Sequence, residues 1–389
     1  MKKIVLMTSI ILSILLAATS SVLGEEKKSD SEPNLAEDAK SAILMERDTG
    51  KILFNKNADE KLPPASMTKI MTLLLIMEAL EEGKIKKNET ITVSERAASM
   101  GGSQIFLEAG EEMSVNDLLK GIAIASGNDA SVALAERIAG SEEAFVKQMN
   151  KKADELGLKN THFKNTTGLP AKNHYSTSHD MAVMAKELLK YESITAYTSI
   201  YEDYLRKGKK NEFWLVNTNK LVKFYPGVDG LKTGYTNEAK YCLAATAEKN
   251  GMRVISVVMG ADTTKERNAA VTQMLDYAFN HYETKNLYEK NETVTKIELI
   301  KAEEKDIDIV TSESVSTIHK KGETDGKIKS SVVLKNDLSL PIKKGDKVGE
   351  LMVENGKKVL SRTPLIVNHD VKPASYFTLL KRSLQNLVK

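Results

Sequence analysis

The sequence predicts a mixed α/β (α+β) fold, in which an antiparallel sheet is flanked by helices and joined to an all-helical subdomain. Two observations predict it: β-hairpin patterns over residues 42–55 and 241–259, and helical periodicity over most of the chain between them. A third observation is a change near residue 286, where short β-rich segments with frequent turns predict a separate small all-β domain. The 389 residues are 41% hydrophobic and 28% charged, which is ordinary for a globular protein of two or three compact units.

Residues 1–24 have the pattern of a secretory signal peptide. They begin with Met1, Lys2 and Lys3, continue as an apolar run over 4–18, and end in small residues before Gly24. A membrane span needs about 20 apolar residues, so the pattern favours export, although an uncleaved anchor is the alternative. Both interpretations place the remaining chain outside the cytoplasm.

The first large unit, expected over 25–285, begins and ends with strands. Residues 42–47 and 51–55 flank the turn Asp48-Thr49-Gly50, and residues 241–247 and 252–259 flank Asn250-Gly251, which is a strong hairpin signal. We expect the two hairpins to share one antiparallel sheet. The helical patterns in this unit cover 67–80, 115–124, 130–138, 181–189 and 264–280.

A small β-rich domain is expected over 286–370, with a different kind of segment over 371–389. The predicted strands are 294–300, 307–310, 332–334, 349–353 and 358–360. In the tail, Tyr376, Leu380, Leu384 and Leu387 recur at helical spacing beside the basic residues Lys381, Arg382 and Lys389. This pattern predicts an amphipathic helix that lies on a membrane surface, and the alternative is a helix packed on the β-rich domain.

Composition and residue spacing exclude several classes of function. The chain has 56 basic and 53 acidic residues, and the resulting net charge of +3 indicates no nucleic-acid partner. Cys242 is the single cysteine, so no intramolecular disulfide forms, and its place in a predicted strand indicates a small buried side chain. The histidines His162, His174 and His179 lie in one region, but their spacing matches no ligand motif, so we expect no metal and no cofactor.

The first motif with chemical content is Ser66-Met67-Thr68-Lys69, which leads into an apolar helix. Residues three apart share a helix face, so the Lys69 amine can reach the Ser66 hydroxyl and act as its base if it is neutral. Burial in the apolar helix, or a second cation nearby, would lower the lysine pKa enough for this. Taken alone, the pair also fits a helix cap followed by a solvated lysine.

Two further motifs carry polar groups at the ends of predicted elements. Ser126-Gly127-Asn128 lies between two helical segments and can project a hydroxyl and an amide into a cleft, although plain helix capping explains it equally well. Lys232-Thr233-Gly234 precedes the strand near Tyr241 and offers a cation, a hydroxyl and space for a substrate backbone. A surface turn is the alternative for this last motif.

The three motifs in this order form the signature set of penicillin-binding proteins and serine β-lactamases. From about Ala42 to the C-terminus the chain resembles the low-molecular-mass penicillin-binding proteins of the D-alanyl-D-alanine carboxypeptidase family, and most of all the sporulation-associated type from Gram-positive rods. Residues 101–107, 165–169 and 174–177 also resemble that family. The resemblance implies a penicillin-binding-protein/β-lactamase-like transpeptidase fold, and an exported enzyme at the outer face of the cytoplasmic membrane or in the cell wall.

The resemblance implies a serine-type D-Ala-D-Ala carboxypeptidase that removes the terminal D-alanine from peptidoglycan stem peptides and is acylated by β-lactam antibiotics. Carried over residue by residue, Ser66 is the acylated nucleophile and Lys69 its base. Lys232 and Thr233 bind the terminal carboxylate beside Gly234. Ser126 passes a proton to the departing amine, Asn128 holds the substrate amide, and the backbone N–H groups of Ser66 and Tyr235 form the oxyanion hole.

Two alternatives belong to other functional classes. A serine β-lactamase shares the three motifs, and in class A enzymes a glutamate activates the deacylating water. Glu155 is the nearest local candidate for that glutamate, but the residues around it lack the expected asparagine. A non-catalytic wall-binding or scaffold protein would retain the fold with a damaged motif, and no motif is damaged here.

Overall fold

The computed structural model describes residues 33–323 and 326–387 of the chain. The predicted signal peptide, residues 1–24, lies outside the described residues. Among the described residues, no helix has both the length and the apolar character needed to cross a membrane.

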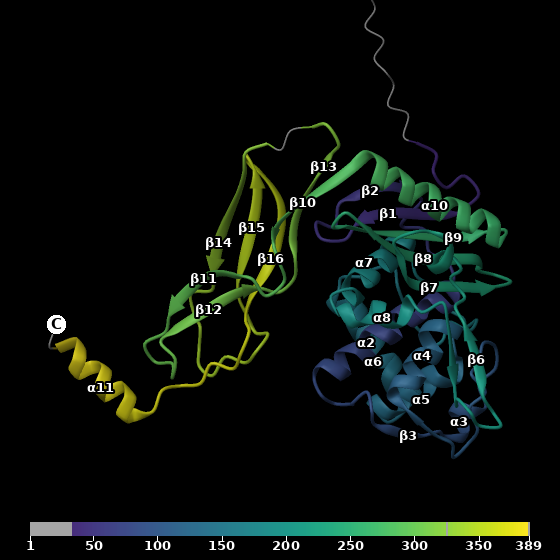
Figure 1. Cartoon of the computed structure of the whole chain (residues 1–389), viewed down its shortest axis with the longest axis horizontal. Coiled ribbons are helices and arrows are strands. Elements are labelled where there is room, and N and C mark those ends of the chain that lie inside the picture. Colours follow the sequence, from purple (N-terminus) through teal and green to yellow (C-terminus); the bar gives the residue numbers. More distant parts are fainter. Residues whose placement is uncertain (1–32, 324–325, 388–389) are drawn as a thin grey trace, which may run out of the picture. The chain divides into compact units, whose positions relative to one another are not determined.

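A five-stranded antiparallel sheet forms the framework of the first large unit, with the strand order β2-β1-β9-β8-β7 (Figure 1). The prediction that both hairpins share one sheet is therefore confirmed, because β1 pairs with β9. The Lys232-Thr233-Gly234 motif, which was expected to precede a strand, lies within β7, and β7 is an edge strand of this sheet. The strands are β1 (Ser41–Glu46), β2 (Ile52–Lys56), β7 (Val228–Thr236), β8 (Lys240–Lys249) and β9 (Met252–Ala261).

The two faces of this sheet are buried against different helices. Leu44, Val254 and Val258 pack with Val271 and Leu275 of α10 (Thr264–His281) on one face. Alternate strand residues, which point to the opposite face, belong to the core that contains α2 and α7. Figure 1 shows α10 on one side of the sheet and α2, α4, α5, α6 and α7 on the opposite side.

The predicted helices are confirmed with small shifts at their ends, and α6 was not predicted. In α6 the buried residues Phe145, Met149 and Ala153 recur four residues apart, which is helical spacing, so the signal for this helix was present in the sequence. The elements of this region are η1 (Ala65–Thr68), α2 (Lys69–Glu81), α3 (Glu95–Ala98), α4 (Val115–Ala125), α5 (Asn128–Ala139), α6 (Glu142–Glu155), α7 (Ser178–Leu188), η2 (Glu192–Ile194), α8 (Thr195–Thr198) and α9 (Leu221–Phe224). Two small hairpins complete it, β3 (Thr90–Thr92) with β4 (Glu112–Ser114) and β5 (Glu202–Leu205) with β6 (Phe213–Val216).

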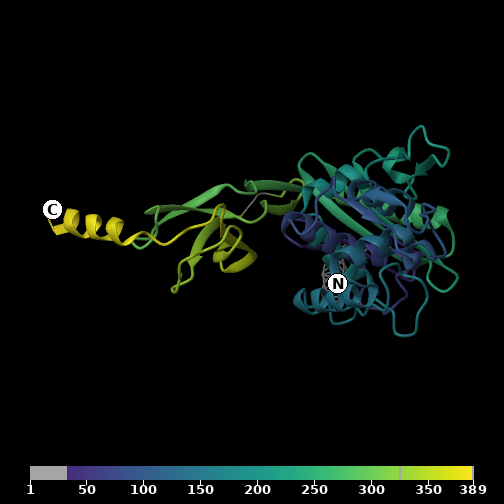
Figure 2. The same ribbon diagram turned by 90° about the horizontal axis from the view of Figure 1, so that it is seen from below.

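The C-terminal region is all-β, as predicted, and has its own hydrophobic core around Ile309, Leu351 and Leu365. Its five-stranded sheet has the order β11-β12-β16-β15-β14, and β10 pairs with β13. The chain ends in α11 (Tyr376–Leu387), the yellow helix in Figure 2. The strands are β10 (Tyr282–Tyr288), β11 (Thr293–Glu298), β12 (Asp306–Thr311), β13 (Val315–Lys320), β14 (Ile328–Leu334), β15 (Lys347–Asn355) and β16 (Lys358–Val367).

Candidate active site

Ser66 lies in the tight turn η1, directly before α2. The sequence predicted a helix from residue 67, but residues 65–68 form a 3₁₀ turn and the α-helix begins at Lys69. Two prolines precede the turn, and Ala65 has a left-handed backbone with φ of 47°, so regular α-helical geometry cannot extend further towards the N-terminus. Residues 69–77 of α2 are all buried, and they anchor the serine on a rigid element.

Lys69 has its amine at the centre of three hydrogen-bonding contacts. Nζ lies 3.1 Å from Ser66 Oγ, 2.6 Å from Asn128 Oδ1 and 2.8 Å from the Thr167 carbonyl oxygen. The side chain is fully buried, and burial followed by the nearby charge of Lys232 holds the lysine pKa well below its usual range, against an opposing effect of Asp129. A neutral amine has two N–H groups and one lone pair, so it donates to the two oxygens and accepts the hydrogen of the Ser66 hydroxyl.

The second motif supplies one contact to Lys69 and one free hydroxyl. Asn128 starts α5, and its Nδ2 donates to the Gly101 carbonyl at 2.6 Å, which fixes the amide so that Oδ1 faces Lys69. Ser126 ends α4 in a left-handed conformation with φ of 64°. Its hydroxyl is buried and has no hydrogen-bond partner among the described residues. The group is therefore available to a substrate, since a buried hydroxyl is costly when it stays unpaired.

The third motif lies on β7, which packs directly against η1. A Cβ atom added at Gly234 would lie 2.8 Å from the Pro64 carbonyl oxygen, so the close approach of strand and turn requires glycine. Thr233 Oγ1 donates to Thr218 Oγ1 at 2.7 Å, and Tyr235 is half exposed with its ring 4.5 Å from that of Tyr241. The structure thus brings Thr233, Gly234 and Tyr235 beside the turn that holds Ser66.

Lys232 is buried and donates only to the Thr233 carbonyl oxygen, at 3.1 Å, among the described residues. Burial and the nearby guanidinium of Arg267 lower the pKa of Lys232 to about 7. Arg267 is itself buried in α10, where its side chain donates to Asn268 and forms no ion pair with a described carboxylate. Two buried cations without a carboxylate partner make this end of the site suitable for an anion.

Arg267 was not predicted from the sequence. It shares the buried face of α10 with Ala270, Val271 and Met274. An arginine on an otherwise apolar helix face was the one feature of the sequence that could have indicated a buried cation here. Glu155, the candidate considered for a β-lactamase, pairs with Lys151 and Lys152 at the end of α6. Among the described residues, no carboxylate forms a hydrogen bond with Ser66 or Lys69.

The loop before α7 closes the site and requires glycine at residue 168. Gly168 has φ of +86°, and a Cβ atom there would lie 1.8 Å from the Ala65 carbonyl oxygen. The same loop supplies the Thr167 carbonyl oxygen that accepts from Lys69. Its backbone is fixed because Asn165 Oδ1 accepts hydrogen bonds from the N–H groups of Thr167 and Gly168.

We expect Gly168→Ala to displace this loop, because alanine disfavours the positive φ and its Cβ would clash with the Ala65 carbonyl oxygen. The variant should lower the free energy of unfolding by about 3 kcal/mol or more and slow acylation about 100-fold. Gly157→Ala is the matched control, since Gly157 also has a positive φ (+71°) but nothing within 4 Å of an added Cβ. The control is expected to lose about 1 kcal/mol. Urea unfolding and acylation rates measure both, and equal losses in the two variants would contradict the steric argument.

His174, one of the histidines whose spacing matches no ligand motif, forms a hydrogen bond with Thr68, which lies between Ser66 and Lys69. The Lys164 N–H donates to His174 Nδ1 at 3.1 Å, so the ring proton is on Nε2, which donates to Thr68 Oγ1 at 2.8 Å. Burial, followed by the charge of His162, lowers the pKa of His174 to about 4. The imidazole is therefore neutral in the folded protein at neutral pH.

This histidine predicts an acid-sensitive contribution to stability. The unfolded chain takes up the proton near the ordinary histidine pKa of 6.5 and the folded protein only near pH 4, so stability is complete above pH 6.5 and is lost as the pH falls towards 4. Between pH 7 and 4.5 we expect the wild-type protein to lose about 2 kcal/mol more than His174→Gln, which keeps a donor and an acceptor but does not titrate. Urea unfolding followed by Trp214 fluorescence at both pH values measures this. Identical pH dependence in the two proteins would disprove the assignment.

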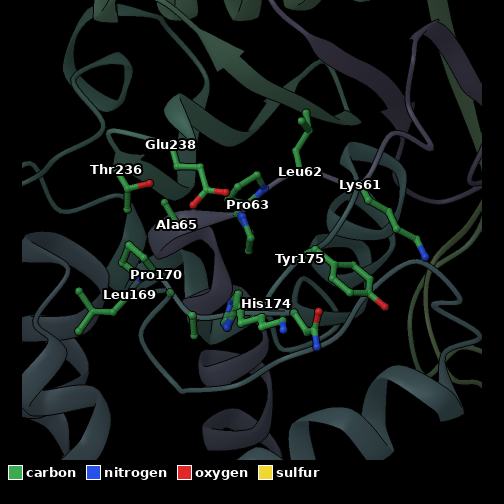
Figure 3. Close-up of a pocket in the computed structure, with 15 residues that line it drawn as sticks. Lys61, Leu62, Pro63, Ala65, Leu169, Pro170, His174, Tyr175, Thr236 and Glu238 are labelled. Carbon is green, nitrogen blue, oxygen red and sulfur yellow. The ribbon is translucent and has the colours of Figure 1, made fainter.

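A cavity of about 620 Å³ opens next to η1, with Ala65 in its wall (Figure 3). Its walls come from the segment before η1, from the loop that precedes α7 and from the residues after the Lys-Thr-Gly motif. The lining residues are Lys61, Leu62, Pro63, Pro64, Ala65, Gly168, Leu169, Pro170, Ala171, Lys172, Asn173, His174, Tyr175, Thr236 and Glu238. The cavity therefore borders the turn that holds Ser66, while Lys232 is not among its lining residues.

Comparisons with known proteins agree with this arrangement. A family model described as D-alanyl-D-alanine carboxypeptidase matches residues 26–263, and one described as penicillin-binding protein 5, C-terminal domain, matches residues 282–373. The D-alanyl-D-alanine carboxypeptidase DacF of Bacillus subtilis is 58% identical over 386 residues, covering 99% of each chain. DacC of Escherichia coli is 36% identical over 351 residues, covering 87% of this chain and 86% of that protein.

Solved structures give the same result. Penicillin-binding protein 5 from Haemophilus influenzae matches with a TM-score of 0.66 and 33% identity, covering 86% of this chain and 98% of that chain. Penicillin-binding protein D2 from Listeria monocytogenes, in an ampicillin-bound form, matches with a TM-score of 0.55 and 32% identity, covering 64% of this chain and 100% of that chain. The first match extends into the β-rich region as well, since 86% of this chain is more than the part before residue 282 contains.

Proposed function

The chain belongs to the D-alanyl-D-alanine carboxypeptidase family of serine peptidases, and from this premise we propose that its acyl-enzyme forms on Ser66. The observation that carries the proposal is the position of Lys69 Nζ, which lies 3.1 Å from Ser66 Oγ while two oxygens accept its own hydrogens. The amine is thereby oriented with its lone pair towards the serine.

The proposed reaction has two steps. Ser66 Oγ attacks the carbonyl carbon of the penultimate D-alanine as Lys69 takes the hydroxyl proton, and the backbone N–H groups of Ser66 and Tyr235 stabilise the oxyanion. The C–N bond breaks, Ser126 delivers a proton to the leaving amine, and D-alanine departs. Water then hydrolyses the Ser66 ester and releases the shortened peptide.

The remaining site residues position the substrate in this proposal. Lys232 and Thr233 bind the terminal carboxylate, and the buried cationic environment of Lys232 and Arg267 favours an anion at that place. Asn128, which accepts a hydrogen bond from Lys69, also binds the substrate amide in this proposal. We also propose that β-lactams acylate Ser66, as the ampicillin-bound form of the Listeria protein supports by similarity.

Mass spectrometry of a pentapeptide ending in D-Ala-D-Ala tests the reaction directly. Incubation with the purified protein is expected to remove one alanine, and the Ser66→Ala variant is expected to remove none. A fluorescent penicillin should label the wild-type protein covalently and leave Ser66→Ala unlabelled. Absence of both reactions in the folded wild-type protein would support a scaffold function, and penicillin hydrolysis at many turnovers per second would support a β-lactamase.

We further propose that the protein is exported, acts in the cell wall during sporulation, and contacts the outer face of the membrane through α11. Tyr376, Phe377 and Leu380 of this helix are exposed, which supports membrane contact. Arg382, however, donates to the carbonyl oxygens of Ile300, Ala302 and Glu303, so this basic residue binds the β-rich region and not a lipid headgroup. Deleting residues 373–389 should move the protein from the membrane to the soluble fraction, and unchanged fractionation would count against anchoring.

A further inference from the structure

We propose that the outer face of the β5–β6 hairpin binds the glycan to which stem peptides are attached, through the rings of Tyr204 and Trp214. The ligand class is a β-linked polysaccharide of N-acetylated pyranose sugars. The inference rests on the proposed function, since it concerns the polymer that carries the proposed substrate. It deepens that function by naming glycan-linked peptides as better substrates than free peptides.

The two aromatic residues lie side by side on the solvent face of the hairpin. Tyr204 and Trp214 are directly opposite each other on β5 and β6, and opposed residues of an antiparallel pair point to the same face. The next residue along each strand, Leu205 or Leu215, points to the other face and is buried in the core that contains α2 and α7. Figure 1 shows β6 at the outer side of the helical region. The aromatic face is therefore open to a ligand.

The rings are half covered, which suits a sugar more than a lipid bilayer. Trp214 is 54% exposed and Tyr204 is 42% exposed, so the protein covers about half of each residue. The face of an aromatic ring is negative and attracts the C–H groups on the face of a pyranose. By contrast, Tyr376 and Phe377 of α11 are 73% and 79% exposed, and protruding side chains of this kind are those that enter a membrane.

The charge beside the rings is negative. Glu202 is exposed and lies two residues before Tyr204, so it shares the aromatic face. Its carboxylate accepts hydrogen bonds from the hydroxyl and amide groups of a sugar, and an anionic membrane surface would repel it. The exposed Lys207, Lys209 and Lys210 lie in the turn beyond the paired strands. These charges favour a neutral glycan on the aromatic face.

The hairpin is joined to the candidate active site at both of its ends. After β6, Thr218 Oγ1 accepts a hydrogen bond from Thr233 Oγ1 at 2.7 Å. At the turn, Arg206 donates to the carbonyl oxygens of Ile105 and Phe106, in the loop that also fixes the second motif of the site.

The reach of a stem peptide agrees with this position. Trp214 is four residues before Thr218, and four residues span at most about 14 Å, whereas an extended five-residue stem spans about 17 Å. A glycan on the hairpin therefore lies close enough to the site for its own stem peptides to reach Ser66.

The fluorescence of Trp214 tests binding directly. It is the single tryptophan of the chain, so its emission reports on this face alone. Soluble glycan strands freed of their peptides should change the emission of the wild-type protein and reach saturation. Tyr204→Ala should weaken the apparent affinity about 10-fold, as is typical for loss of an aromatic anchor. Phe224→Ala, which removes an exposed aromatic residue of α9 outside the hairpin, should bind as the wild type does.

Vesicles containing phosphatidylglycerol are the comparison ligand in this titration. They should leave the emission maximum of Trp214 where it is. A shift with vesicles and none with glycan would overturn the inference and make this face a membrane contact. No response to either ligand would overturn it as well.

The effect on catalysis is measured by D-alanine release from one pentapeptide, either free or attached to glycan strands. The wild-type enzyme should have about 10-fold higher kcat/KM for the glycan-linked form, and Trp214→Ala should reduce this preference to about twofold or less. Equal kcat/KM for the two forms in the wild-type enzyme, or an unchanged preference in Trp214→Ala, would overturn the inference and leave the proposed function intact. Failure to release D-alanine from either form would overturn the proposed function itself.

Discussion

Replacing Lys69 with methionine is expected to lower the rate of Ser66 acylation by about 10³-fold, because the change removes the base and leaves a side chain of similar length. The variant also leaves Asn128 Oδ1 and the Thr167 carbonyl oxygen without the amine that donates to them. Stopped-flow measurement of covalent labelling by a fluorescent penicillin gives the rate directly. Lys69→Arg should be similarly slow, since a guanidinium stays charged and cannot accept the serine proton.

The control for this experiment is Lys186→Met. Lys186 is a partly buried lysine of α7 whose Nζ donates to the Asp48 carbonyl oxygen at 3.1 Å. This substitution changes a lysine to methionine within the same domain but outside the site, so acylation should stay within about twofold of the wild-type rate. Acylation of a folded Lys69→Met variant at more than a tenth of the wild-type rate would show that another group accepts the proton.

The sequence predicted the fold wherever apolar periodicity was strong or a turn signal was sharp. The Asn250-Gly251 turn defined one hairpin, and the continuous apolar run of α2 defined the central helix. The hairpin of β5 and β6 was not predicted, because its strands are four residues long and each buries only one residue, Leu205 and Leu215. In those elements, packing against the rest of the domain determines the structure more than local preference does.

In the candidate site, too, some features could be predicted from the sequence and others could not. Ser66, Lys69 and Asn128 were predicted from motif spacing, and the structure places all three within one set of hydrogen bonds. Their assigned roles stay predictions until they are measured. The third partner of Lys69, the Thr167 carbonyl oxygen, could not be predicted, because a backbone oxygen leaves no signature in the residue types. The same is true of the proximity of Arg267 to Lys232, which depends on how α10 packs on the sheet.

Replacing Lys232 with methionine is expected to lower kcat/KM for a D-Ala-D-Ala peptide by about 100-fold, because a buried charge that pairs with the substrate carboxylate is removed. A second peptide with an amidated C-terminus separates this role from a structural one. The wild-type enzyme should discriminate strongly against the amide, whereas Lys232→Met should treat the two peptides nearly alike. If the variant still preferred the free carboxylate by the wild-type factor, another cation would be the carboxylate-binding group.

The charge of Lys232 also predicts how activity depends on pH. Its pKa of about 7 belongs to the free enzyme, so kcat/KM for the carboxylate peptide should fall as the pH rises above 7 and the ammonium loses its proton. The positive charge of Lys232 also helps to keep the pKa of Lys69 low. When Lys232 loses its proton, the substrate carboxylate is bound less well and Lys69 becomes harder to keep neutral, and both changes lower kcat/KM.

Arg267→Gln tests the origin of this pH dependence. Removing the like charge beside Lys232 should raise the lysine pKa and move the alkaline limb of the kcat/KM profile to higher pH. Lys265→Gln, an exposed charge two residues earlier at the start of α10, should leave the limb where it is. A limb that does not move in Arg267→Gln would mean that burial alone lowers the pKa of Lys232.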